Sequence, residues 1–350
     1  MAAPAATPLY FPPGDGAPSG KSRLMFRFLV RRVIGALVIL LIISAITFWL
    51  FYAVPRDPAM MSCGKNCTPE NLEQIRKNLG IDKPIPVQYW LWLVGIFAGR
   101  NYAGFDYCNA PCLGYSFANR EPVYDTIMDR LPTTLSLAFG AAVVFLILGI
   151  GAGMLAALKQ GKFLDKFASS ASLLGSSLQI YFVGYIAMFF FVAQLGWLSQ
   201  PQYTPLTDDP GAWFSGLLLP WLVLAIIFTA NYTRMTRSQL VEQLSEDYVR
   251  TARAKGLSRA NVFFRFAWRG AMGPIVTVFG IDLGTLIGGA IITESTFSLQ
   301  GIGRLAVKSV DQSDLPMLLG VTLLAAGAIV FFNILVDAVY ALIDPRIRLA

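Results

Sequence analysis

The sequence contains no histidine, and charged residues make up only 14% of its 350 residues. Without histidine, neither a histidine acid/base relay nor a histidine metal site can exist. The scarcity of charge, together with 55% hydrophobic residues, argues against a soluble domain with a single buried core. A nucleotide-binding loop is missing as well, because that motif needs four residues between its glycines, whereas five separate Gly14 from Gly20. Energy for any work done by this chain must therefore come from a partner protein or from an ion gradient.

What the sequence has instead is a series of long apolar segments. A helix that crosses the hydrocarbon core of a bilayer needs about 20 mostly apolar residues. Six segments reach that length, and they predict an all-α polytopic membrane protein with six transmembrane helices. These segments cover residues 33–54, 133–158, 168–198, 213–236, 272–297 and 315–342.

Lysine and arginine gather on alternate connections between these segments. They precede the first segment, join the second to the third and the fourth to the fifth, and follow the sixth; the connection after the third holds Asp208 and Asp209 and no base. Short cationic connections stay on the cytoplasmic side of a membrane. We therefore expect cytoplasmic termini and an extracytoplasmic loop region between helices 1 and 2. The net charge of +7 then reflects topology and attraction to anionic lipid, and no nucleic-acid partner is expected.

Polar residues inside the apolar segments are candidates for lining a solute pathway. In the fifth segment, Asp282, Thr285 and Thr293 share one stripe of a helix with 3.6-residue periodicity. The alternative is that Asp282 is merely hydrogen-bonded inside the helix bundle. The candidate pathway residues are Asn231, Asp282, Thr285 and Thr293.

Small residues in the same segment predict a packing surface. Gly280, Gly284 and Gly288 repeat every four residues on a face roughly opposite Asp282, which suits the close approach of another helix. In the sixth segment, Asn333 and Asp337 are four residues apart, and we expect them to be structural.

The connection between the fourth and fifth segments, residues 238–270, has a helical pattern of its own. Leu240, Leu244, Tyr248 and Ala252 are spaced by four and predict one apolar helix face. Gly256 supplies the left-handed position at which such a helix ends.

A second short helix is expected after this bend. Ser258 is placed to cap it, and residues 262–268 are rich in aromatic side chains with flanking bases. Two short helices joined at a bend predict a shaped docking surface. A connector that lies at the membrane interface without a partner is the alternative.

Residues 248–256 carry a motif that resembles the EAA loop of ABC importer permeases, in the form shared by the peptide and nickel branch. The glutamate of the general motif falls on Arg250 and its first alanine on Thr251, so only Ala252 and Gly256 match, a departure that is typical of this branch. The likeness covers residues 24–348. Further matching stretches are residues 55–58, 79–84, 86–89, 130–135, 294–304 and 344–348.

This set resembles the B-type permease of dipeptide and oligopeptide importers, which implies a type I ABC importer permease fold. Members of that family work beside a second, related permease subunit, two cytoplasmic ABC ATPases and an extracytoplasmic substrate-binding protein. ATP and Mg²⁺ would then bind the ATPases, and no cofactor, metal or catalytic residue is expected on this chain. The resemblance implies that the loop docks an ATPase through Tyr248, Arg250, Thr251, Ala252, Arg253, Lys255 and Gly256.

The resemblance also implies a division of the chain. We expect a disordered basic cytoplasmic tail over residues 1–29, the first transmembrane helix over 30–54, the extracytoplasmic region over 55–131 and the permease core over 132–350. A permease of the same family for nickel or another small solute is one alternative. A stand-alone ion-coupled carrier is another, which the docking loop and the few membrane carboxylates disfavour.

Four cysteines lie in two pairs in the expected extracytoplasmic region, in stretches that look inserted relative to the family. Thiols outside the cytoplasm favour disulfides, and four cysteines allow three connectivities. A four-thiolate zinc or iron–sulfur site and free thiols are the alternatives. The cysteines are Cys63, Cys67, Cys108 and Cys112.

Overall fold

The computed structural model describes residues 19–53, 59–60, 63, 67–80, 83–102, 107–116 and 118–343, with only the backbone described for 19–29, 53, 79 and 339–343. Residues 1–18 of the expected tail therefore lie outside the described residues, and α1 begins at Ser19. The matching stretches 55–58 and 344–348 lie outside them as well.

Five of the described helices are long and apolar enough to cross a membrane, or six if one bent pair counts as a span, so the predicted class is confirmed. They are α1 (Ser19–Ala53), α5 (Val123–Leu158), α8 (Pro210–Ser245), α11 (Trp268–Ile287) and α14 (Leu315–Ile343). Helix α11 follows directly on α10 (Arg259–Asn261) and the π-helix η2 (Val262–Ala267). The only sheet in the described part is a two-residue pairing of β1 (Tyr115–Ser116) with β2 (Glu121–Pro122).

The third expected span is not one straight helix. It consists of α6 (Phe163–Ser177) followed by α7 (Ile180–Ala187) and the π-helix η1 (Met188–Gln194), and the two halves are bent by 97°. At the break, the Ser176 and Ser177 hydroxyls both donate to the Leu173 carbonyl, which competes with the helical hydrogen bonds. Leu178 and Gln179 then take extended backbone angles. Hydropathy does not reveal this bend because both halves are apolar.

The fifth expected span, residues 272–297, is also broken. Helix α11 ends at Ile287, and α12 (Ile291–Thr296) follows after Gly289, whose φ of 130° is one that residues with a side chain rarely adopt. A Cβ on Gly289 would lie 2.8 Å from the Gly303 Cα, so the close approach needs glycine too. Helix α13 (Ile302–Asp311) completes this region.

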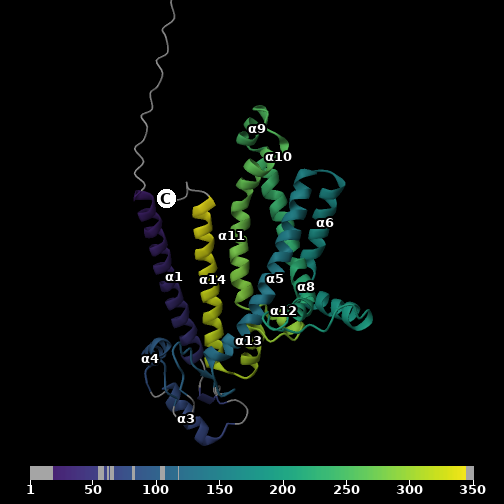
Figure 1. The fold of residues 1–350 in the computed structure, drawn as a ribbon. Helices are drawn as coiled ribbons and strands as arrows, with labels where there is room; N and C mark the ends of the chain where they lie inside the picture. The colour runs from purple at the N-terminus through teal and green to yellow at the C-terminus, as the bar shows by residue number, and fades with distance from the viewer. Residues whose placement is uncertain are drawn as a thin grey trace, which may run out of the picture.

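Helix α8 is longer than its expected span. Its 36 residues extend to about 54 Å at 1.5 Å per residue, whereas the hydrocarbon core is about 30 Å thick. The chain then forms α9 (Asp247–Ala254) and α10 at one end of the molecule, which we name the α9 end (Figure 1). Helices α3 (Pro69–Leu79), α4 (Ile85–Ala98) and α13 lie at the opposite end, the disulfide end (Figure 1).

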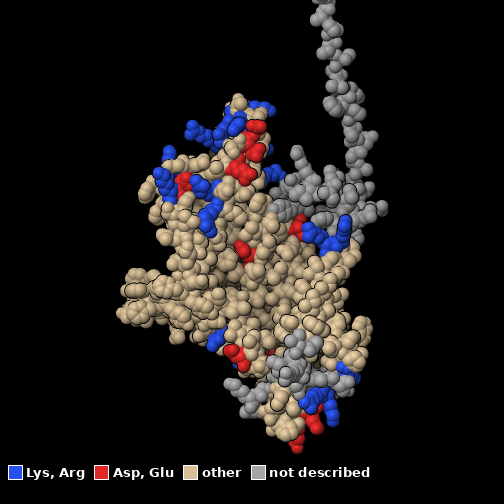
Figure 2. Space-filling view, turned by 180° about the vertical axis from the view of Figure 1, so that it is seen from behind, with Lys and Arg blue, Asp and Glu red and all other residues tan. Residues whose placement is uncertain are grey.

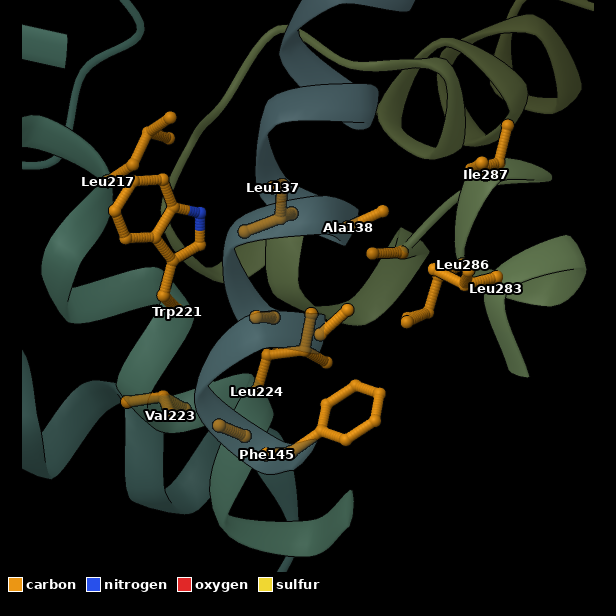
Figure 3. Packing of buried hydrophobic residues seen from close by; sticks show 14 of the residues in the cluster. Leu137, Ala138, Phe145, Leu217, Trp221, Val223, Leu224, Leu283, Leu286 and Ile287 are labelled. Atoms are coloured by element: carbon orange, nitrogen blue, oxygen red, sulfur yellow. The ribbon is translucent and has the colours of Figure 1, made fainter. Parts of the chain in front are cut away.

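The main core lies between α5, α8 and α11, whose apolar side chains point toward one another (Figure 3). Glycines on α5 let α8 approach closely: a Cβ on Gly140 would lie 2.1 Å from the Trp221 ring, and one on Gly149 would lie 2.6 Å from the Tyr232 Cβ. The Trp221 indole N–H donates to the Ser136 carbonyl over 3.0 Å. These contacts make α5 and α8 a tightly packed pair.

The predicted glycine face of α11 packs against α14. A Cβ on Gly280 would lie 1.9 Å from Val336, one on Gly284 2.8 Å from the Ile329 Cα, and one on Gly288 3.0 Å from the Ala325 Cβ. In the same helix α14, Asp337 accepts from Arg32 of α1, with the closest pair of atoms 2.8 Å apart. The expected structural role of Asp337 is thus visible as a link between α1 and α14.

All four cysteines are paired. Disulfides join Cys63 to Cys67 and Cys108 to Cys112, which leaves no free thiolate among them for the alternative metal site. Cys108 and Cys112 are buried in a cluster with Trp92 of α4 and residues of α1 and α14, whereas Cys67 is exposed. The two bridges therefore sit in different environments.

Candidate functional site

The connection between α8 and α11 forms the tip of the α9 end. Helix α8 ends at Ser245, whose hydroxyl donates to the Glu242 carbonyl over 2.7 Å, and Glu246 then takes extended backbone angles. Because α9 starts anew at Asp247, the expected continuous face through Leu240, Tyr248 and Ala252 does not exist. The restart changes which side of the chain faces the bundle.

Val249, rather than Tyr248, anchors α9. Val249 is fully buried against Val262 and Ala267 of the η2 segment, together with Ala252, whereas the Tyr248 side chain is 42% exposed. The prediction was right for Ala252 and wrong for Tyr248. The sequence signal for Val249 was present, because it is the most apolar residue of the short helix that follows Glu246.

Tyr248 folds back onto the junction of α8 and α11. Its hydroxyl donates to the Gln243 side-chain oxygen, and a Cβ on Gly270 would lie within 3 Å of both groups. Burial raises the pKa of the Tyr248 phenol, and the Glu246 carboxylate adds to this effect, so the hydroxyl remains a proton donor. Tyr248 thus links α9 to α8 through its hydrogen bond to Gln243.

The exposed part of the tip is cationic. Of the residues predicted to dock an ATPase, Arg250, Thr251, Arg253, Lys255 and Gly256 are exposed, and Figure 2 shows bases gathered at this end. The ion pair between Arg250 and Asp247 is long, at 3.5 Å, and both side chains are mostly in solvent, so it holds Arg250 only weakly. The guanidinium can therefore turn to another acidic partner.

The bend at Gly256 has the predicted geometry. Its φ is 78°, and a Cβ there would meet nothing within 4 Å, so backbone conformation alone favours glycine. The Ser258 side chain accepts from the Asn261 N–H at 3.4 Å, as expected of a helix cap. Phe263 and Ala267 of the aromatic segment are buried, so this segment is the first part of the α11 span and not a separate surface helix.

An ion pair that the sequence patterns did not predict ties α8 to α6 near the tip. The Arg237 guanidinium of α8 binds both carboxylate oxygens of Asp165, one of them at 2.9 Å, and the Gly161 N–H donates to the same carboxylate at 2.8 Å. The Asp165 side chain is only 5% exposed. The available signal was a single acid among three lysines at residues 159–166, where α6 begins.

Asp282 lies where the core meets the lateral surface of the molecule. The Tyr232 hydroxyl, buried between the helices, donates to the Asp282 carboxylate over 2.8 Å, while Asp282 itself stays partly exposed. Thr285 of α11 and Asn231 of α8 are exposed. The hydrogen bond agrees with the alternative that Asp282 is bonded within the bundle, and its role in a solute pathway stays a prediction.

Thr293 does not belong to this group. It lies on α12, beyond the break at Gly289, and is 1% exposed. The expected stripe assumed one continuous helix through residue 297, and the break moves Thr293 out of phase with Asp282. The prediction was wrong because a glycine with positive φ ended the helix.

A second acid, Glu294, is fully buried and belongs to the matching stretch 294–304. Its carboxylate accepts from the Thr134 hydroxyl of α5 at 2.8 Å and from the backbone N–H of Arg304 at 2.9 Å, with the Gly303 N–H as a further donor. The Thr134 oxygen in turn accepts from the Ile302 N–H at 2.8 Å. The first turn of α13 is thus an anion-binding helix terminus whose anion is supplied by the same chain.

The glycines around Glu294 explain the spacing of that stretch. A Cβ on Gly301 would lie 2.3 Å from the Glu294 carboxylate carbon, and one on Gly303 would lie 2.7 Å from the Ile291 backbone. Both positions therefore need glycine for close approach. The signal in the sequence was an acid in an apolar segment, followed by two glycines at the start of a helix.

Two family models match the chain and together cover most of it. The first describes the N-terminal part of the membrane component of binding-protein-dependent transport systems and matches residues 25–138. The second describes the inner membrane component of binding-protein-dependent transport systems and matches residues 149–349.

Curated relatives match over nearly their whole length. The chain is 37% identical to a protein of Brucella melitensis biotype 1 whose name assigns it to a peptide transport system as the permease, over 93% of this chain and 99% of that one. It is 35% identical to the dipeptide transport system permease protein DppB of Escherichia coli strain K12, over 93% of this chain and 99% of that one. Among solved structures it is similar to the MetNI methionine ABC transporter in inward-facing conformations, at 14% identity and a TM-score of 0.49, over 63% of this chain and 97% of that one.

The described helices, the shaped connection between α8 and α11, and these matches agree with one another. Five to six apolar helices fit a multi-pass membrane protein, and the second family model alone spans more than half of the sequence. The chain belongs to the family of inner membrane components of binding-protein-dependent transport systems.

Proposed function

We propose that this chain is the permease subunit of an ATP-driven importer of dipeptides or oligopeptides and forms half of the translocation pathway. The names of its relatives support the peptide substrate. A second, related permease, two cytoplasmic ATPases that bind ATP and Mg²⁺, and an extracytoplasmic substrate-binding protein complete the transporter. The chain itself carries no ATP site in this proposal.

The α9 end faces the cytoplasm in this arrangement. The observation that carries the proposal is the exposed cationic tip around Arg253. Helix α8, which is longer than a membrane-spanning helix needs to be, and the η2 segment carry this tip outside the membrane-spanning part of the bundle. A connection that only joined two spans would not need a buried anchor such as Val249. The tip therefore suits docking to a water-soluble ATPase.

The anchors of the tip suggest how ATPase movement reaches the membrane. Val249 packs α9 on η2, which continues directly into α11, while the pair of Arg237 and Asp165 ties α8 to α6. Helices α6, α8 and α11 would then follow α9 together, as in a switch between inward-open and outward-open states. Asn231, Asp282 and Thr285 lie on surfaces of α8 and α11 that the second permease would face across the pathway.

The proposal is tested with reconstituted membranes. Proteoliposomes that contain this chain with its sister permease, its ATPases and its binding protein should accumulate a labelled dipeptide only when ATP is supplied on the ATPase side. Uptake that persisted without ATP and followed a proton or sodium gradient would overturn it. ATP-driven uptake of a nickel chelate, without peptide uptake, would retain the mechanism and change the substrate.

The docking role has its own test. Arg253→Glu reverses a charge at the tip and should lower uptake about tenfold, most strongly at low salt, because exposed charges steer association. Lys77→Glu is the matched control, since Lys77 is an exposed base on α3 at the disulfide end. Equal losses in both variants would contradict a specific role for the tip.

A further inference from the structure

Two adjoining cavities lie at the disulfide end, beside α5 and the segment around Gln300; α13 lines the smaller one and residues 201–203 line the larger one. One has a volume of about 340 Å³ and the other of about 530 Å³, and both are lined by Glu121, Thr126, Arg130 and Gln300. Each is within the size range of a small-molecule site, about 300 to 1,000 Å³. None of the sequence-predicted site residues lines either of them.

The lining carries charges of both signs. Arg304 and Lys308 line the smaller cavity, Asp129 lines the larger one, and Arg130 and Glu121 line both. Within the described part of the chain, no ion pair joins any of these five side chains to another. The charges are therefore available to a ligand.

Neutral groups orient some of these side chains. Arg130 donates to the Gln300 side-chain oxygen, and Arg304 donates to the Ser298 carbonyl. A neutral partner positions a charge without cancelling it. Such charged groups retain their capacity for strong, charge-assisted hydrogen bonds.

The wall of the smaller cavity is rigid. Gly301 and Arg304 belong to the turn that Glu294 holds through backbone N–H groups, and this turn is linked to α5 through Thr134. Arg130 lies one helical turn before Thr134 on the same face of α5. The cations are thus attached to two elements that buried hydrogen bonds hold in register, so less order has to be created on binding.

We propose that these cavities receive a short zwitterionic peptide, with Arg130, Arg304 and Lys308 holding its carboxylate and Glu121 and Asp129 its ammonium group. The inference rests on the proposed function and assigns a substrate-binding site at the extracytoplasmic mouth of the pathway. Because the side chains are partly exposed, binding is weak. A transport pathway needs a site that a solute can both enter and leave.

The test measures weak binding to the assembled transporter, without its binding protein, by saturation-transfer NMR. The probes are Ala-Ala, its C-terminal amide and its N-acetyl form, and the variants are Lys308→Gln and Asp129→Asn, both at exposed side chains. We expect Lys308→Gln to weaken Ala-Ala and the N-acetyl form about three- to tenfold and to leave the amide unchanged. Asp129→Asn should weaken Ala-Ala and the amide and spare the N-acetyl form.

Controls and a second readout separate the alternatives. Lys77→Gln and Asp208→Asn remove exposed charges from the same end outside the cavities and should change no affinity. Absence of binding to the wild type, or equal effects on all three probes, would overturn the site. So would variants that bind peptide normally but need more binding protein for uptake, since these cavities would then be a protein-docking surface. Failure of ATP-driven uptake in the wild type would instead overturn the proposed function.

Discussion

The two ends of the molecule are stabilised in different ways. At the α9 end, one short helix with a small buried face is carried by long helices, and most of its charged side chains lie in solvent. At the disulfide end, buried acids, hydroxyls and backbone N–H groups join segments far apart in the sequence, while the two cystines close short local loops; for example, Ser116 donates to the buried Asp314, which also caps α14. The first arrangement suits a surface that can move, and the second suits a rigid frame.

The largest effect is expected from removing the acid at the centre of that frame. Glu294→Ala leaves the Thr134 hydroxyl and the N–H groups of α13 buried without their acceptor, which should cost about 3 kcal/mol of stability. Thermal unfolding of the purified transporter measures the change. Glu242→Ala, at an exposed position on α8, is the control and should change stability little. Similar losses in the two variants would remove the distinction between the two ends.

The two disulfides should differ in their contribution to the frame. Each closes a loop of five residues, so the chain-entropy effect is similar, about 2 kcal/mol. Replacing Cys108 and Cys112 by serine also places polar groups in a buried cluster, whereas serine at position 67 meets solvent. We therefore expect the buried pair to matter more in unfolding and in uptake. If all four serine substitutions left folding, assembly and uptake unchanged, the bridges would have no part in holding the frame.

The smallest change in stability and the clearest change in activity are expected at Gly256. Gly256→Val strains a left-handed residue at a local cost of about 1 kcal/mol and displaces the tip, so uptake should fall while membrane insertion stays normal. Gly196→Val is a matched control, because Gly196 also has positive φ, at 61°, and also has open space around its Cβ position. Uptake and expression are measured for both. If transport by Gly256→Val were unimpaired, the bend at Gly256 would not be needed to couple the ATPase to transport.

Sequence patterns predicted the parts of the structure that depend on nearby residues. The bend at Gly256 and the cap at Ser258 depend on one backbone conformation, and the structure has both. The apolar segments depend on composition over one helix, and the described part of the structure has five such helices and one bent pair. The packing face of Gly280, Gly284 and Gly288 was visible for the same reason. Periodicity failed where a helix stopped, at Glu246 and Gly289, because a restart changes the phase of every later residue.

Sequence by itself determined the class of this protein: apolar length requires a membrane, and the motifs resemble a family that the comparisons confirm. Tertiary structure alone decided that Val249 rather than Tyr248 anchors the tip, that Asp165 joins Arg237, and that Glu294 holds the start of α13. The physical reason is the distance along the sequence over which each interaction acts. Crossing a bilayer is a property of one segment, whereas a buried charge becomes stable only through partners that are distant in the sequence and adjacent in the fold.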